Sequence, residues 1–126
     1  MARKKSTTLT EAELRLMNVL WTRGASTVNE VLDDLSTDPP LAYNTVLTTL
    51  RILEQKNYVK HKKDGRAFLY APRVQREQAQ RSALRQLLDR FYENSAEHLI
   101  LNVLKHEKLN PAELQRLKRM IEEAGE

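Results

Sequence analysis

The sequence predicts a mainly helical protein that contains one small β-hairpin. Signatures of helix starts recur along the chain, alternating β-prone residues occupy only the segment 58–70, and helical spacing returns after Pro72. The length of 126 residues suits one small domain with an appended region, and 40% apolar residues are enough to form a core. The change of pattern after Pro72 predicts a first domain of residues 1–72 and a second, helical domain of residues 73–126.

A capping signature predicts that the first helix begins after Thr10. The Thr10 hydroxyl can accept hydrogen bonds from the free amides of the first turn, and Glu13 completes a capping box. Leu9 and Leu14 occupy the two positions that form a hydrophobic staple around this N-cap. Gly24 can end the helix with a left-handed backbone. The apolar residues expected to face the core are Leu14, Met17 and Trp21.

A second capping box, Thr27 with Glu30, predicts a short second helix. Its expected buried residues are Val28, Val31, Leu32 and Leu35. The turn-forming residues 36–40 are expected to end this helix. A third helix is then predicted from about residue 42 to residue 56. Its apolar side consists of Val46, Leu50 and Leu53.

The segment 58–70 contains two β-prone runs on either side of Asp64-Gly65, a dipeptide that favours a tight hairpin turn. The pairs expected from this turn are Val59 with Tyr70 and His61 with Phe68. They would form one largely apolar face, with His61 packed near Phe68. Lys60 and Lys62 would then point to the opposite face.

Three further helices are predicted after Pro72. The first covers residues 75–92, the second covers residues 95–106, and the third begins at a cap formed by Asn110 and Pro111. The last two are short amphipathic segments with too little mass to bury their own apolar sides. We therefore expect a second copy of the chain to cover them, although they could also fold back onto the first domain as ordinary core. The expected dimer residues are Leu99, Ile100, Val103, Leu104, Leu114, Leu117, Met120 and Ile121.

Two basic clusters point to a nucleic acid as the partner. The net charge is +4, and the cations gather in residues 3–5 and in the hairpin. The hairpin cluster consists of Lys60, Lys62, Lys63 and Arg66. These side chains can supply sequence-independent affinity for phosphates, although a lysine-rich turn is also compatible with simple solvation.

The outer side of the third helix carries groups that bond to phosphates and base edges. At about 100° per residue, the residues opposite the apolar side are Asn44, Thr45, Thr48, Arg51 and Gln55, with Tyr43 at the N-terminal shoulder. No carboxylate occurs between residues 41 and 53, which suits a surface that faces DNA. Three helices followed by a basic hairpin is the order of a winged helix-turn-helix, which places its third helix in the major groove. The expected contacts to double-stranded operator DNA are Tyr43, Asn44, Thr45, Thr48, Arg51, Lys60, Lys62, Lys63 and Arg66.

Two segments of the chain resemble a known protein family. The segments LTEAELRLMNVLW and AYNTVLTTLRILEQKNYVKHKKDGRAFLYAP are similar to the penicillinase-repressor family of bacterial regulators, the BlaI/MecI-like proteins. The resemblance extends from Leu9 to the last helix, and it is most specific in the third helix and the hairpin. It implies a winged helix followed by a helical dimerisation region, and a homodimer that represses resistance-type genes from an inverted-repeat operator. It also implies that Tyr43, Asn44, Thr45 and Thr48 approach DNA.

The resemblance also suggests a route of release. In the resistance branch of the family, signalling through a membrane sensor-protease leads to cleavage in the dimerisation region, after an Asn that precedes Phe. The segment HLILNVLKHEKL aligns Asn102-Val103 with that bond, and Val103 replaces the Phe. Asn102 is therefore either a cleavage position or an ordinary residue of the helix surface. The copper-responsive branch uses a cysteine cluster, and this chain has no cysteine.

Other classes of function are less compatible with the sequence. It has no nucleophile motif, phosphate loop or metal-ligand spacing, so we expect neither an enzyme nor a cofactor. The alternatives are a winged helix used for protein–protein contact and a metal-responsive regulator that uses His98 and His106. The apolar runs are too short to span a membrane and no signal peptide is apparent, so we expect a cytoplasmic protein without membrane insertion.

Overall fold

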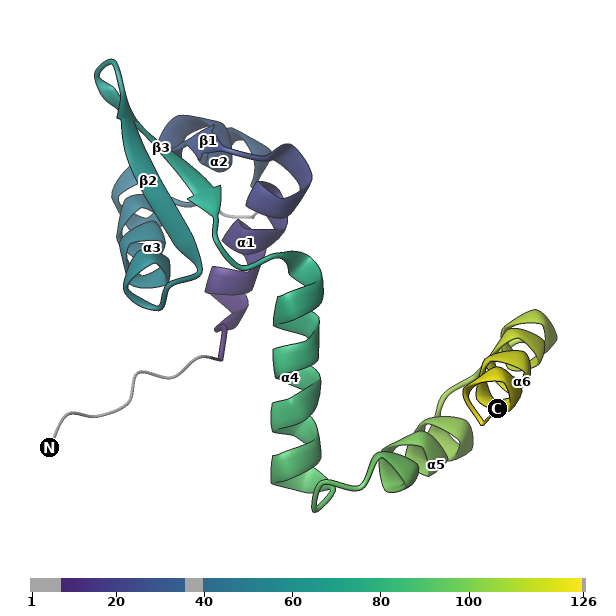
Figure 1. Cartoon of the computed structure of the whole chain (residues 1–126). Helices are drawn as coiled ribbons and strands as arrows, with labels where there is room; N and C mark the ends of the chain where they lie inside the picture. Colours follow the sequence, from purple (N-terminus) through teal and green to yellow (C-terminus); the bar gives the residue numbers. More distant parts are fainter. Residues whose placement is uncertain (1–7, 36–39, 126) are drawn as a thin grey trace, which may run out of the picture. The chain divides into compact units, whose positions relative to one another are not determined.

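The computed structural model describes residues 8–35 and 40–125. The basic residues 3–5 and most of the predicted helix break at 36–40 lie outside the described residues. The chain divides into two compact units, Met1–Ala83 and Leu84–Glu126, and the helix α4 (Arg76–Phe91) runs from one into the other (Figure 1).

The first unit has the predicted composition of three helices and a hairpin. Its elements are α1 (Glu11–Arg23), β1 (Ser26–Thr27), α2 (Val28–Asp34), α3 (Tyr43–Gln55), β2 (Val59–Asp64) and β3 (Ala67–Pro72). The strands form an antiparallel sheet in the order β1-β3-β2, and β2 and β3 project beyond the helices of this unit (Figure 1). Strand β1 was not predicted, because two residues are too few to produce a recognisable alternation.

The predicted starts of α1 and α2 are confirmed by their caps. The backbone amide of Glu13 donates to the Thr10 hydroxyl over 3.1 Å, and the amide of Thr10 donates to the Glu13 carboxylate over 2.7 Å. The reciprocal pair at Thr27 and Glu30 has distances of 3.2 and 2.9 Å. Gly24 ends α1 with a φ of 90°, a backbone conformation that residues with a Cβ rarely adopt.

The core confirms the predicted apolar side of α3 and corrects that of α1. Val46, Leu50 and Leu53 are fully buried, whereas Leu14, which we predicted to be buried, is 41% exposed. The buried residues of α1 are Glu13, Leu16, Met17 and Leu20. The prediction placed Glu13 only in the capping box, but its side chain is also buried, so the buried side of the helix is turned away from Leu14.

The hairpin exists, but its predicted pairing is wrong by two residues. Val59 lies opposite Pro72 and His61 lies opposite Tyr70, so the loop is Gly65-Arg66 rather than Asp64-Gly65. Gly65 has a φ of 63°, and a glycine at the first loop position is what a type II′ turn requires. A shift of two residues leaves every side chain on its predicted face, because strand alternation has a period of two.

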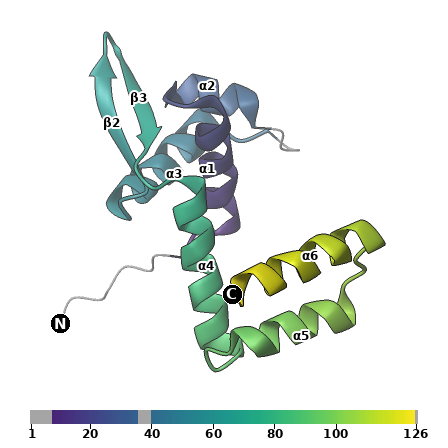
Figure 2. The ribbon, with the colours of Figure 1, turned by 45° about the vertical axis from the view of Figure 1, so that its right-hand side comes forward.

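The second unit contains the end of α4 and the two amphipathic helices α5 (Ala96–His106) and α6 (Pro111–Ala124). The chain turns back between them (Figure 2). The predicted cap of α6 is present, because the Asn110 amide oxygen accepts from the backbone amide of Glu113. The Ser95 hydroxyl caps α5 in the same way, which was not predicted. In the described part of this unit only Leu88 is a buried apolar residue. None of the helices in the described ranges has the length and apolar character that crossing a bilayer requires.

Candidate nucleic-acid interface

The outer face of α3 is an exposed polar surface. Its side chains with potential DNA contacts are all exposed: Tyr43, Asn44, Thr45, Thr48 and Arg51. Because Val46, Leu50 and Leu53 are fully buried, the opposite side of the same helix is fixed against the core. The helix therefore presents a defined set of donors, acceptors and methyl groups to the outside.

The N-terminus of α3 differs from those of α1, α2, α5 and α6. Those four helices have a side-chain cap, whereas Ala42, the residue before α3, provides none. The first turn of α3 also contains no acidic residue. As far as the described residues go, the first backbone amides of α3 therefore have no capping side chain, and these amides and the positive end of the helix dipole suit an anion such as a DNA phosphate.

The hairpin carries the predicted cations on its exposed surface. Lys60, Lys62, Lys63 and Arg66 are exposed, and none of them forms an ion pair with another described residue. Lys60 and Lys62 share one face of β2, opposite to the face that packs on the core. Their charges are thus not neutralised within the described part of the protein, which is the condition for strong attraction to a polyanion.

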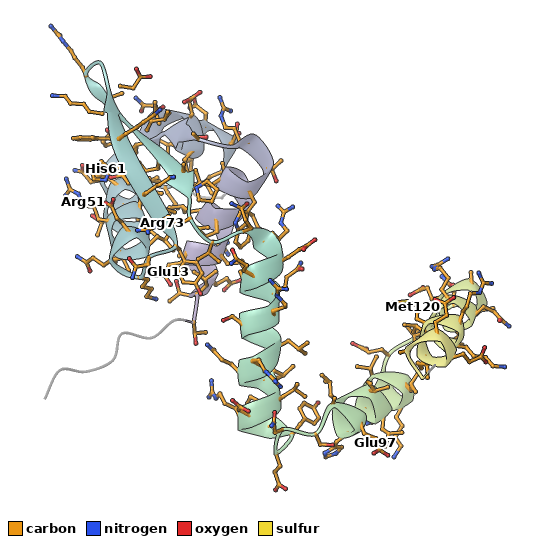
Figure 3. The ribbon with its side chains drawn as sticks, viewed as in Figure 1. Glu13, Arg51, His61, Arg73, Glu97 and Met120 are labelled. Carbon is orange, nitrogen blue, oxygen red and sulfur yellow. The ribbon has the colours of Figure 1, made fainter. Side chains whose placement is uncertain are left out.

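An unpredicted contact joins the hairpin to α3. Nδ1 of His61 lies 2.8 and 2.6 Å from the two carboxylate oxygens of Glu54. The His61 ring also packs against Phe68, at 5.2 Å between ring centres, as expected, and against Tyr70 at 5.4 Å. Burial raises the pKa of the Tyr70 hydroxyl, and the nearby Glu54 raises it further. These contacts fix β2 beside α3, and Figure 3 shows His61 and Arg51 on these neighbouring elements.

A buried ion pair holds the same, C-terminal end of α3 against α1. Nζ of Lys56 lies 2.8 Å from Oε1 of Glu13, whose side chain is only 4% exposed. Burial by itself raises the pKa of Glu13, but hydrogen bonds from Lys56 and Thr10 together with the Lys56 charge lower it overall. Lys56 also donates to the carbonyl oxygen of Thr8. No sequence periodicity indicated this pair, because the two residues lie 43 positions apart.

The predicted dimer residues form an exposed apolar surface in the second unit. Leu99 is half-buried, and the other seven are exposed: Ile100, Val103, Leu104, Leu114, Leu117, Met120 and Ile121. Met120 and Ile121 are each 63% exposed. Amphipathic helices that leave their apolar sides in water are typical of a surface that another molecule covers.

Asn102 and Val103 lie in the middle of α5, within regular helix. The half-buried Asn102 side chain donates to the Tyr92 hydroxyl over 3.2 Å. The Tyr92 ring meets His98 edge to face at 5.1 Å. Among the described residues, no three or more His, Cys, Asp or Glu side chains are grouped so that they could hold a metal ion. His98 and His106 therefore belong to no such group.

Comparison with known proteins identifies relatives along almost the whole chain. A family model described as penicillinase repressor matches residues 9–123. The chain is 31% identical over 120 residues to the penicillinase repressor of Bacillus licheniformis, covering 95% of this chain and 94% of that protein. It is 44% identical over 69 residues to the transcriptional regulator BlaI of Mycobacterium tuberculosis, covering 54% and 50%.

One similar solved structure covers more than half of the chain. The solution structure of the DNA-binding domain of the repressor BlaI aligns with a TM-score of 0.51 and 33% identity. This alignment covers 60% of the present chain and 93% of that domain. It agrees with the arrangement of three helices and a hairpin described above, so the fold is a winged helix followed by a helical region.

Proposed function

The chain belongs to the penicillinase repressor family, and on this premise we propose that it represses transcription by binding an inverted-repeat operator as a homodimer. Residues 1–72 bind DNA and residues 73–126 join the two copies. The regulated genes are of the β-lactam-resistance type or related to it. The observation that carries the proposal is the exposed polar face of α3 beside four hairpin cations that form no ion pair with a described residue.

Chemistry at this surface supports DNA rather than protein as the partner. Asn44 and Arg51 can bond to base edges or phosphates, and the methyl groups of Thr45 and Thr48 can contact a thymine. A protein-binding helix would instead present an apolar patch on this face. The similar solved structure is itself that of a DNA-binding domain.

The exposed apolar surface of α5 and α6 supports the homodimer. The same surface on a second copy of the chain could cover it, since a two-fold interface uses one patch on both subunits. A two-fold dimer also matches the symmetry of an inverted repeat. Cleavage at Asn102-Val103 is then one route of release, since it would divide α5 and with it the dimer surface. A protease would first have to unwind the helix around Asn102, because proteolysis acts on locally opened chain.

Selection of bound duplexes from a random DNA library, followed by affinity measurements at several salt concentrations, tests the proposal. We expect a palindromic sequence to emerge, with affinity that falls steeply as salt rises, by roughly one unit of log–log slope for each phosphate contact. The single half-site should bind much more weakly than the palindrome. Equal affinity for the selected and scrambled duplexes at physiological salt would refute specific repression.

A further inference from the structure

The side chain of Trp21 connects α1 to the start of α4. Its Nε1–H donates to the carbonyl oxygen of Val74 over 2.8 Å. The guanidinium carbon of Arg76 lies 5.5 Å from the centre of the Trp21 ring, and Nη2 of Arg76 donates to the Thr22 hydroxyl over 3.2 Å. We call Trp21, Thr22, Val74 and Arg76 the α4 clasp. All four belong to the first unit.

The connection that leads from β3 into α4 is held on its other side as well. The backbone amides of Arg73 and Val74 both donate to the carbonyl oxygen of Tyr58, over 2.8 and 3.3 Å. The side chains of Val74 and Ala79 pack against the core of the first unit. The chain is therefore fixed to this unit from the end of β3 through the first turn of α4.

This attachment has a geometric consequence for a dimer. Helix α4 begins in the unit that carries α3 and ends in the unit that carries the exposed apolar surface. The direction in which α4 leaves the first unit therefore helps to determine how far apart the two α3 helices of a dimer lie. On DNA, each added base pair moves a half-site by about 3.4 Å and rotates it by about 35°.

From these contacts we infer that Trp21 and Arg76 are positioning residues that restrict which half-site spacing the repressor accepts. The inference rests on the proposed function, because it presupposes a dimer on an inverted repeat. Neither residue has to touch DNA. An exposed cation–π contact and an exposed hydrogen bond add little to folding stability, so the main consequence of Arg76 is the direction it gives to α4.

Duplexes that differ only in spacing provide the test. The probes are the palindrome selected by the wild-type protein, its single half-site, and versions with one or two base pairs added or removed between the half-sites. The full-length variants are Trp21→Phe, which keeps the ring but removes the N–H donor, and Arg76→Gln, which removes the cation. Arg81→Gln is the control, because Arg81 is an exposed cation on the same helix without a hydrogen bond or ion pair to a described residue.

For the wild type and Arg81→Gln, we expect affinity to fall about tenfold when the spacing changes by one base pair. For Trp21→Phe and Arg76→Gln, we expect a fall of less than about threefold, with half-site affinity unchanged, since the two DNA-binding units can then reorient. Arg76→Lys retains a cation over the ring and should restore most of the spacing preference.

Two results would overturn the inference while leaving the proposed function intact. In the first, Arg76→Gln keeps the full spacing preference of the wild type. In the second, half-site affinity falls as much as palindrome affinity, which would assign the clasp to the stability of the DNA-binding unit alone. A wild type that binds one half-site as well as two would instead refute the dimeric repressor itself and this inference with it.

Discussion

The two units of this protein use helical amphipathicity in different ways. In the first unit, the apolar sides of α1, α2 and α3 cover one another, and Leu50 and Val46 are inaccessible to water. In the second unit, α5 and α6 are just as clearly amphipathic, yet no residue of either helix is buried. Periodicity therefore predicts that a face will be covered, but not which molecule covers it.

The exposed polar surfaces of the two units differ as well. The outer side of α3 has no carboxylate before Glu54, and that carboxylate is held by His61. Helix α6 instead mixes both signs of charge on its surface: Glu113, Arg116, Lys118, Arg119, Glu122 and Glu123. The polar surface of the first unit suits contact with a polyanion, whereas the mixed charges of the second unit suit a solvated rim around an apolar contact. Mutations should therefore separate the proposed DNA binding from the proposed self-association.

Charges placed on the apolar surface of α5 should have the largest effect. We expect the double variant Leu99→Asp/Val103→Asp to weaken self-association by more than about 1,000-fold, because two carboxylates would have to be buried in the interface. Sedimentation velocity at micromolar concentration should give a dimer for the wild type and a monomer for the variant. Glu97→Gln, an exposed polar change in the same helix, should remain dimeric. A monomeric wild type would remove the proposed distinction between the units.

Truncation of a buried residue in the first unit should have the next largest effect, a loss of free energy of unfolding. Leu50→Ala leaves a cavity in a fully buried site, and we expect the free energy of unfolding to fall by about 3 kcal/mol. This loss should not depend on protein concentration. Met120→Ala, in the second unit, should change stability only through dimer formation, so its effect should disappear on dilution. Urea denaturation at two protein concentrations distinguishes these behaviours, and equal concentration dependence in both variants would contradict the comparison.

Much of the first unit could be predicted from sequence because its signals are local. A capping box requires two side chains three residues apart, and the hairpin requires Gly65 within a short loop. The exposed side of α3 was predicted from equally local information, since the spacing of Val46, Leu50 and Leu53 defines the buried side and leaves the opposite face outward. Whether the residues on that face touch DNA stays a prediction.

The contacts that escaped prediction join residues far apart in the chain. Lys56 and Glu13 are 43 positions apart, and Trp21 and Val74 are 53 apart. Neither pair follows from periodicity, and the inward position of Glu13 is also why the exposure of Leu14 was missed. The hairpin register failed for another reason: Asp64-Gly65 and Gly65-Arg66 both suit a tight turn, and only packing of the strands decides between them.

A carboxylate on the outer face of α3 should separate DNA binding from stability. We expect Thr48→Glu to reduce operator affinity by about 100-fold or more, because the new charge would meet phosphates and base acceptors. The melting temperature should stay within a few degrees of the wild type, since Thr48 is exposed. Asn18→Glu adds the same charge to an exposed site on α1 and should affect binding far less. Retained affinity in Thr48→Glu would show that another surface reads the operator.

Removal of the buried cation should have a smaller effect that is confined to the first unit. Lys56→Met leaves Glu13 buried without its charged partner, and we expect a loss of about 2 kcal/mol at neutral pH, moderated by the remaining hydrogen bond that the Thr10 amide donates to the carboxylate. Self-association should be unchanged, because Lys56 lies outside the second unit. A double-mutant cycle with Glu13→Gln isolates the pair, since Lys56→Met should cost little once the carboxylate is absent.

The pH dependence of this loss identifies its electrostatic origin. The pKa of Glu13 is lowered in the folded protein, so the stabilisation by the ion pair is present above the pKa of the unfolded chain, about 4.3. It is lost as the pH falls through the lower, folded value. The stability difference between the wild type and Lys56→Met should therefore shrink on acidification, as measured by urea denaturation from pH 7 downward. A difference that stays constant over this range would mean that Lys56 stabilises the unit by packing its aliphatic chain, and that α3 is held to α1 by apolar contacts alone.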